Sequence, residues 1–219
     1  MIAAFIDGLF RYQFLQNALL TSVIVGLISG VIGSFIILRG MSLMGDAISH
    51  AVLPGVAVSY MFGFNYIFGA SIFGLLAALS IGFITQKSPL INDTAIGVVF
   101  SSFFALGIIF ISFAKSSTDL YHILFGNVLA VADTDILITC VVGVIVLIFV
   151  ALFYKELQLT SFDPTMAQAY GLNIQFFHYA LMFLLTLVAV SSLQTVGTIL
   201  VIAMLITPAA TAYLLTNHL

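Results

Sequence analysis

Long apolar runs separated by short polar breaks occupy most of this chain. A membrane-spanning helix needs ~20 apolar residues to cross ~30 Å of hydrocarbon, and seven runs are close to that length. Because lipid offers no partners to backbone polar groups, each run is predicted to be a helix. The pattern predicts an all-α polytopic membrane protein, a single transmembrane domain over residues 1–219. At least seven spans are predicted, at about residues 18–38, 46–63, 66–86, 94–114, 136–154, 176–191 and 196–215.

Composition supports lipid as the solvent for most of the surface. The chain is 63% hydrophobic and 6% charged, whereas a soluble domain is about 25% charged. The net charge of −3 leaves no basic patch, so nucleic acid is not an expected partner. Cys140 is the single cysteine, which excludes an intrachain disulfide and a cysteine-rich metal site.

Small residues repeat at helical spacing in two of the apolar runs. Gly26 and Gly30 are four residues apart, as are Gly97 and Ser101. Small residues at this spacing let two helix backbones approach closely within a membrane. These positions are therefore predicted to be helix–helix contacts, with no functional role.

The longest polar stretch, residues 155–175, contains the pattern of a short helix. Asp163 suits the N-cap, Pro164 the first helical position and Gly171 the C-terminal stop, with Ala167 between them. A helix of this length does not cross a membrane. It is either a surface loop or a docking lever for a partner protein.

Basic residues give a weak indication of orientation. If Lys155 faces the cytoplasm, alternation of the spans places Arg39 and Lys87 on the same side and Arg11 and Lys115 outside. Positive residues concentrate on the cytoplasmic side of membrane proteins. On this basis the N-terminus is expected to be external.

Asp46 and His50 stand four residues apart in an otherwise apolar run. That spacing places a carboxylate and an imidazole on one face of a helix, and ionisable residues inside a membrane pair, line a polar path or bind an ion. Three readings remain open: a local cap with an interior histidine, a proton relay, or a metal site. Pro54 follows and is expected to distort the helix.

A metal site at Asp46 and His50 would require more than one copy of the chain. Two ligands do not hold a divalent ion alone, but two copies related by a two-fold axis would bring two Asp46 and two His50 together. This predicts a homodimer with the site on its axis. Oxygen and nitrogen ligands suit Mn²⁺, Fe²⁺ or Zn²⁺.

Other polar features are weaker, and one absence is informative. Asp119 and His122 lie in the polar loop before the fifth run and form either a solvated external face or a docking and ion-access surface. Lys87 and Lys115 are followed by Ser but not preceded by Gly, so the chain lacks a Walker A motif. Uphill transport would then draw its energy from a partner or an ion gradient.

The string from Met44 to Gly55, MGDAISHAVLPG, resembles the signature of membrane permeases in the ABC importer family for manganese, zinc and iron(II). In detail the chain is most similar to the manganese permeases of Gram-positive bacteria. Supporting segments occur in the same order over nearly the whole chain. They are Asp93–Gly97, Leu124–Asn127, Phe162–Asn173 and Val196–Ala212.

The resemblance implies a fold akin to the membrane subunit of the vitamin B12 importer, a type II importer permease in the bacterial plasma membrane. It implies a permease homodimer, a cytoplasmic ATP-binding subunit dimer that uses the ATP, and an extracellular metal-binding solute-binding protein. Residues 163–171 would be the coupling helix that docks on the ATPase. Asp46 and His50 would bind the ion in transit, and at least one further span would follow Leu219.

The expected cargo is Mn(II), with Zn(II) or Fe(II) as alternatives and no permanently bound cofactor. Neither catalysis nor ATP hydrolysis is expected of this chain itself. Two other functions remain open from the residues alone. One is a proton-coupled secondary metal transporter, in which Asp46 carries protons, and the other is a membrane scaffold without transport activity.

Overall fold

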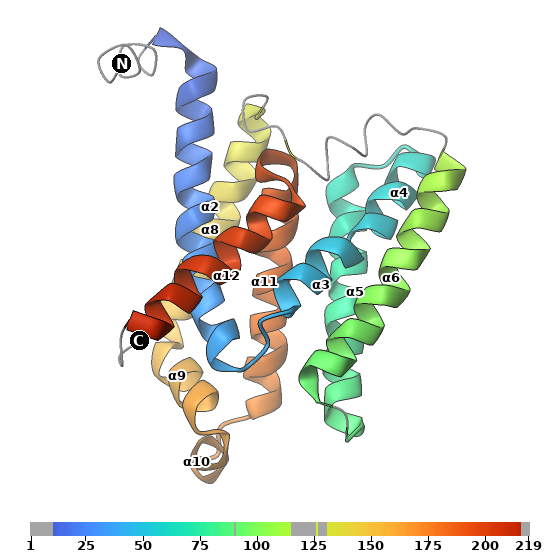
Figure 1. Ribbon diagram of the computed structural model, residues 1–219. Coiled ribbons are helices and arrows are strands. Elements are labelled where there is room, and N and C mark those ends of the chain that lie inside the picture. Colours follow the sequence, from blue (N-terminus) through green and yellow to red (C-terminus); the bar gives the residue numbers. More distant parts are fainter. Residues whose placement is uncertain (1–10, 90, 115–125, 127–130, 216–219) are drawn as a thin grey trace.

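The computed structural model describes residues 11–89, 91–114, 126 and 131–215, and these residues form an all-helical bundle (Figure 1). The helices are α2 (Gln13–Leu38), α3 (Met44–Ala51), α4 (Leu53–Phe62), α5 (Tyr66–Lys87), α6 (Asn92–Ala114), α8 (Asp133–Leu152), α9 (Tyr154–Phe162), α10 (Pro164–Ala169), α11 (Ile174–Val196) and α12 (Thr198–Leu215).

Six of the described helices are long and apolar enough to cross a membrane. They are α2, α5, α6, α8, α11 and α12, and each one overlaps a predicted run. Large apolar side chains remain exposed along them, for example Leu27 on α2 and Ile148 on α8, as expected of helices that face lipid. The multi-pass membrane architecture is therefore confirmed.

The remaining predicted span, residues 46–63, consists of two consecutive helices. α3 ends at Ala51 and α4 begins at Leu53. Pro54 has no N–H to donate to the carbonyl of His50, so the hydrogen-bond ladder is interrupted here. The predicted distortion at Pro54 is confirmed, and neither short helix has the length of a span by itself.

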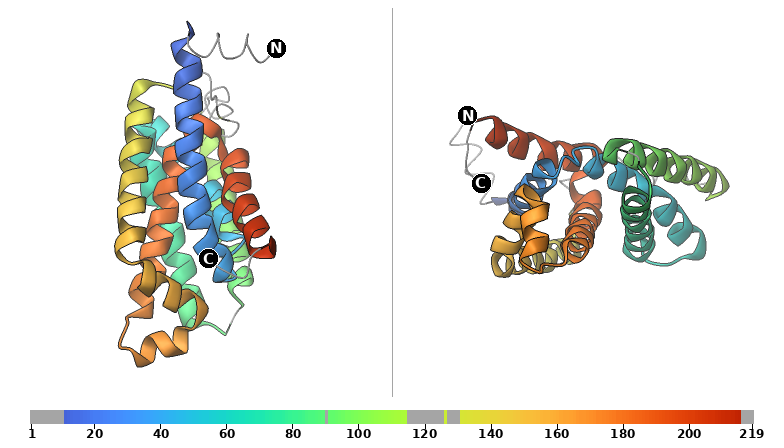
Figure 2. Two further views of the ribbon diagram at one scale, coloured as in Figure 1. Left: turned by 90° about the vertical axis from the view of Figure 1, so that its left-hand side faces the viewer. Right: turned by 90° about the horizontal axis from the view of Figure 1, so that it is seen from below.

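The helices form two groups that α3 connects. α2, α8, α11 and α12 pack together, and α4 packs against α5 and α6. α3 lies between these groups, in contact with α5, α6, α11 and α12 (Figures 1 and 2). A residue on α3 therefore lies where the two groups meet.

Close backbone contacts occur at other glycines than the predicted ones. A Cβ added to Gly33 of α2 would collide with the carbonyl of Leu205 on α12, and one added to Gly55 of α4 would collide with the carbonyl of Gly69 on α5. The predicted contact positions have open space where a Cβ would lie: Gly26, Gly30 and Gly97. Within one chain that prediction is wrong.

Candidate functional site

α3 follows directly on the end of α2 through a tight turn. Gly40 has a φ of 66°, a left-handed conformation that glycine adopts without a steric cost, and its amide donates to the carbonyl of Ile37 over 2.9 Å. One face of α3 then packs into the core, where Met44 and Ile48 are completely buried. This packing fixes the position of the opposite face.

Asp46 and His50 lie side by side on the less buried face of α3. The Nε2 atom of His50 is 3.3 Å from Oδ1 of Asp46, and the side chains are 22% and 41% exposed, respectively. A carboxylate that faces lipid is strongly unfavourable. The exposed part of the pair therefore requires a polar path or a second protein surface.

The other side of the His50 ring is enclosed by α6. The rings of Phe100 and Phe104 lie with their centroids 5.5 Å from the imidazole, at interplanar angles of 72° and 83°. The Nδ1 atom of His50 is buried and has no hydrogen-bond partner in the described part of the chain. The two nitrogens thus have different surroundings, and Nε2 is the one that faces the carboxylate.

Phe100 and Phe104 were not identified from the sequence. They are one helical turn apart on α6, but the chain contains 21 phenylalanines, and apolar spacing alone does not separate these two from the others. Only the placement of α6 against α3 brings them to the imidazole.

The pair offers part of a coordination shell for a divalent ion. Among the described residues, no group of three or more His, Cys, Asp or Glu side chains is close enough to hold a metal. A carboxylate oxygen and an imidazole nitrogen are suitable ligands for Mn²⁺, Fe²⁺ and Zn²⁺. Within the described ranges, the pair by itself therefore supplies two ligand side chains of these four types.

The predicted short helix is present as α10, at the end of the bundle far from the start of α8 (Figure 1). Asp163 caps it by accepting a hydrogen bond of 2.9 Å from the amide of Met166. The hydroxyl of Thr165 and this amide hold the pKa of Asp163 below its ordinary value, so the cap remains ionised at neutral pH. Gly171 follows with a φ of 78°, and Ala167 is buried.

α9, which precedes α10, was not predicted. Hydrogen bonds connect it to Arg39 at the end of α2. The guanidinium of Arg39 donates to Thr160 Oγ1 over 2.8 Å and to Ser161 Oγ over 3.0 Å. Burial lowers the pKa of Arg39 to about 10, which leaves it charged at neutral pH. The α9–α10 unit is therefore linked to the turn that leads into α3.

The other predicted site residues, Asp119 and His122, lie outside the described residues. Gly126, from the predicted motif Leu124–Asn127, is described. A Cβ there would collide with Val196 and Gly197 at the junction of α11 and α12. Gly126 thus lies against the start of the segment Val196–Ala212.

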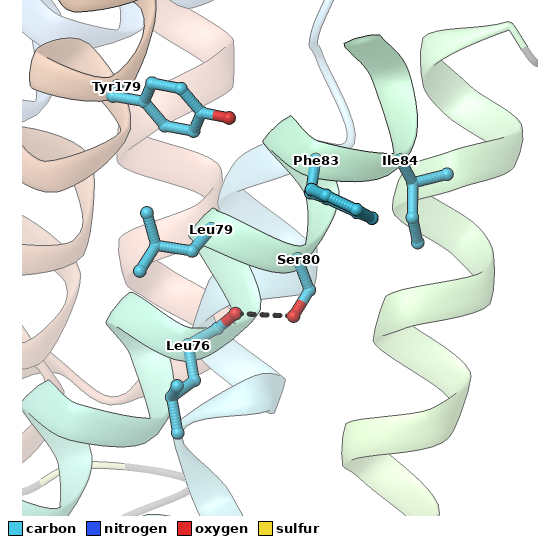
Figure 3. Close-up of a pocket in the computed structure, with 6 residues that line it drawn as sticks. All are labelled: Leu76, Leu79, Ser80, Phe83, Ile84 and Tyr179. Carbon is cyan, nitrogen blue, oxygen red and sulfur yellow. Dashed lines mark hydrogen bonds between the residues drawn. The ribbon is translucent and has the colours of Figure 1, made fainter. Parts of the chain in front are cut away.

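A groove of about 500 Å³ lies between α5 and α11 (Figure 3), and neither Asp46 nor His50 is among its lining residues. Leu76, Leu79, Ser80, Phe83, Ile84 and Tyr179 line it. The Ser80 hydroxyl donates to the carbonyl of Leu76 over 2.7 Å. The groove is mostly apolar and offers no carboxylate or imidazole to an ion.

The fold and the site define a helical multi-pass membrane protein with a carboxylate–imidazole pair on the partly exposed face of α3. The pattern of the ABC 3 transport family matches residues 11–219. The chain belongs to this family.

Close relatives include proteins named for manganese transport. The manganese transport system membrane protein MntC of Listeria monocytogenes is 73% identical over 98% of this chain and 77% of its own length. The manganese import system permease protein ScaB of Streptococcus gordonii is 61% identical over 100% of this chain and 79% of its own length.

Two solved structures are similar in fold. A chain of PsaBC from Streptococcus pneumoniae, solved in complex with Fab, superposes with a TM-score of 0.87 at 61% identity, over 100% of this chain and 79% of that one. A metal-chelate type ABC transporter in an inward-facing conformation has a TM-score of 0.70 at 16% identity, over 95% of this chain and 77% of that one. The second likeness concerns the fold alone.

Proposed function

We propose that the chain is the permease subunit of an ATP-driven importer of divalent transition-metal ions, with Mn(II) as its cargo. The observation that carries the proposal is the Asp46–His50 pair, whose Oδ1 and Nε2 atoms lie 3.3 Å apart on the partly exposed face of α3. Two relatives more than 60% identical are named as manganese transport proteins, which supports Mn(II) over other ions.

The functional unit is a homodimer in this proposal. One chain supplies two suitable side chains, and the described residues contain no larger cluster. A two-fold axis beside the exposed face of α3 would bring two carboxylates and two imidazoles together. The same arrangement covers the 41% of the Asp46 side chain that is exposed in a single chain.

In this proposal, the two ends of the bundle contact different partner proteins. α10 docks on a dimer of cytoplasmic ATP-binding subunits, since its caps give it two ordered ends and exposed Met166 and Tyr170 offer an apolar contact surface. A metal-binding solute-binding protein delivers the ion outside, at the surface that includes Asp119 and His122. The complex resides in the bacterial plasma membrane.

The fold in this proposal is that of a type II importer permease, with α3 and α4 together completing a seventh crossing. ATP binding and hydrolysis in the partner move α10, and α9 passes this movement to Arg39 through two hydrogen bonds. Only the short turn of residues 40–43, which includes Gly40, separates Arg39 from the start of α3. The ion at Asp46 and His50 is then exposed to one side of the membrane at a time.

Cell-associated metal tests the site directly. In cells that depend on this permease, Asp46→Ala and His50→Ala should each lower manganese accumulation at least tenfold, because losing one of two ligands halves the protein's contribution to the shell. Manganese, zinc and iron are measured by inductively coupled plasma mass spectrometry. Membrane levels of each variant are checked by immunoblot.

Asp93→Ala is the matched control, because Asp93 is an exposed carboxylate in the first turn of α6 and is not part of the site. It should accumulate manganese normally. If Asp46→Ala and His50→Ala are expressed and also accumulate metal normally, the site assignment is wrong.

Iron(II) is the second candidate cargo. An iron transport system membrane protein of Haemophilus influenzae is 42% identical over 94% of this chain, so the family includes relatives named for another metal. Uptake of ⁵⁴Mn and ⁵⁵Fe into proteoliposomes with the partner subunits distinguishes the two. Uptake without ATP that collapses with the proton gradient would instead favour a secondary transporter.

A further inference from the structure

The helix backbone does not determine which edge of the His50 ring faces Asp46. Rotation about the last side-chain torsion of histidine is broad and roughly two-fold, so α3 fixes the Cβ atom but not the ring. Yet Nε2 faces Asp46 and Nδ1 is buried. The Asp46 carboxylate attracts one ring nitrogen, and neighbours outside α3 restrict the remaining rotation of the ring.

Phe100 and Phe104 of α6 are the aromatic neighbours that contact the ring. Both lie nearly perpendicular to the imidazole, with centroids at 5.5 Å, an arrangement that the charge distribution of aromatic rings favours. The two phenyl rings also stack on each other at 5.7 Å with an interplanar angle of 13°. The imidazole therefore meets a pair of rings that restrain one another.

Aromatic contacts replace the usual second contact of a metal-binding histidine. Such a histidine commonly donates its other ring N–H to an acceptor, which orients the ring and makes the ligand a stronger donor. In the described part of the chain, Nδ1 of His50 has no such acceptor. Phenyl edges orient the ring without strengthening it as a ligand.

We propose that Phe100 and Phe104 are positioning residues that hold the His50 ring with Nε2 presented to the transported ion. This rests on the proposed function, since it concerns the same site. Because Nδ1 is buried, the ion reaches the ring only from the side of Asp46. The result is a ligand that is oriented but weak, which suits an ion that must be released after each passage.

Equilibrium binding of Mn²⁺ to the permease–ATPase complex in lipid nanodiscs tests the proposal. The double variant Phe100→Leu, Phe104→Leu should raise the Kd about tenfold, the lower end of the 10–100-fold loss seen when orienting neighbours of metal ligands are removed. Phe100→Tyr with Phe104→Tyr keeps both rings and should restore binding to within about twofold of the original, a rescue that general loss of packing does not predict.

Phe103→Leu is the control on the same helix. Phe103 lies between the pair in sequence, but its ring packs against Phe73 at 6.4 Å. It should leave the Kd unchanged, and it removes as many atoms as Phe104→Leu alone and half as many as the double variant. If the double variant does not assemble, Phe104→Leu alone is measured, with an expected rise of at least threefold.

Two results would overturn the positioning role: an unchanged Kd in the leucine variants, or equal weakening by Phe103→Leu. Asp46→Ala and His50→Ala are measured beside them. If these two bind Mn²⁺ normally, the proposed function itself fails. If they lose binding while the assembled leucine variants retain it, only the role of Phe100 and Phe104 fails.

Discussion

The imidazole of His50 meets one carboxylate on its own helix and two phenyl rings on α6. The carboxylate is four residues away, and a helical reading of the sequence is enough to pair it with His50. The phenyl rings belong to an element about 50 residues further along the chain, and such tertiary neighbours have no local signal. The pairing of Asp46 with His50 was therefore predictable from the sequence, and the orientation of the imidazole was not.

The close contact between Gly55 of α4 and Gly69 of α5 leads to a prediction about stability. Gly55→Ala should destabilise the protein by about 3 kcal/mol or more, because the new methyl group would collide with the carbonyl of Gly69 and overpacking against a backbone is not relieved by a rotamer change. Thermal unfolding in detergent measures the loss.

Gly97→Ala is the matched substitution for that experiment, since nothing lies within 4 Å of the added Cβ. It should be neutral or stabilise the protein by up to about 1 kcal/mol, because alanine has the better helix propensity. Equal melting temperatures for the two variants would refute the close contact between α4 and α5.

At the scale of elements, sequence patterns located helices well but not their interruptions and attachments. Hydropathy found every described spanning helix, since apolar length is the signal that lipid imposes. Pro54 correctly indicated a distortion, but not that the run becomes two helices. α9 was missed because its nine residues, YKELQLTSF, lack a regular apolar stripe, and contacts such as those with Arg39 stabilise it instead.

The docking role of α10 can be tested by removing both of its ends. Asp163→Ala removes the cap, which costs about 1 kcal/mol, and Gly171→Leu places a branched side chain at a φ of 78°, where glycine is strongly preferred. The double variant should co-purify with less ATP-binding subunit and show uncoupled ATPase activity.

Gln175→Ala changes an exposed residue near the start of α11 and is the control for the α10 variant. It should assemble and transport normally. Unchanged assembly and transport in the double variant at Asp163 and Gly171 would contradict the docking role.

At the scale of the whole molecule, the Asp46–His50 pair is only partly enclosed by a single chain. Most of the surface of α3 is buried among four other helices, but the Asp46–His50 pair faces outward in part. A single chain that exposes a carboxylate inside a membrane would be unfavourable. In the proposed homodimer, association of two chains would cover this exposed carboxylate.

Metal stoichiometry tests the arrangement of the two chains. Purified permease at saturating Mn²⁺ should bind one ion per two chains, because both copies of the pair contribute to one shell. Metal content is measured by mass spectrometry against protein determined by amino-acid analysis, with Asp46→Ala as the variant that should bind none. A ratio of one ion per chain would contradict the shared site.

The contact between Gly33 and the Leu205 carbonyl limits which amino acids can replace these two residues during evolution. The collision that a Cβ at position 33 would cause is with backbone, so no substitution at position 205 can relieve it. Position 205 supplies its carbonyl whatever its side chain, but the side chain is buried and lies close to Gly45, so it must be apolar and of similar size. Among functional descendants of this sequence, glycine should stay fixed at 33, while apolar residues of similar size can replace Leu205.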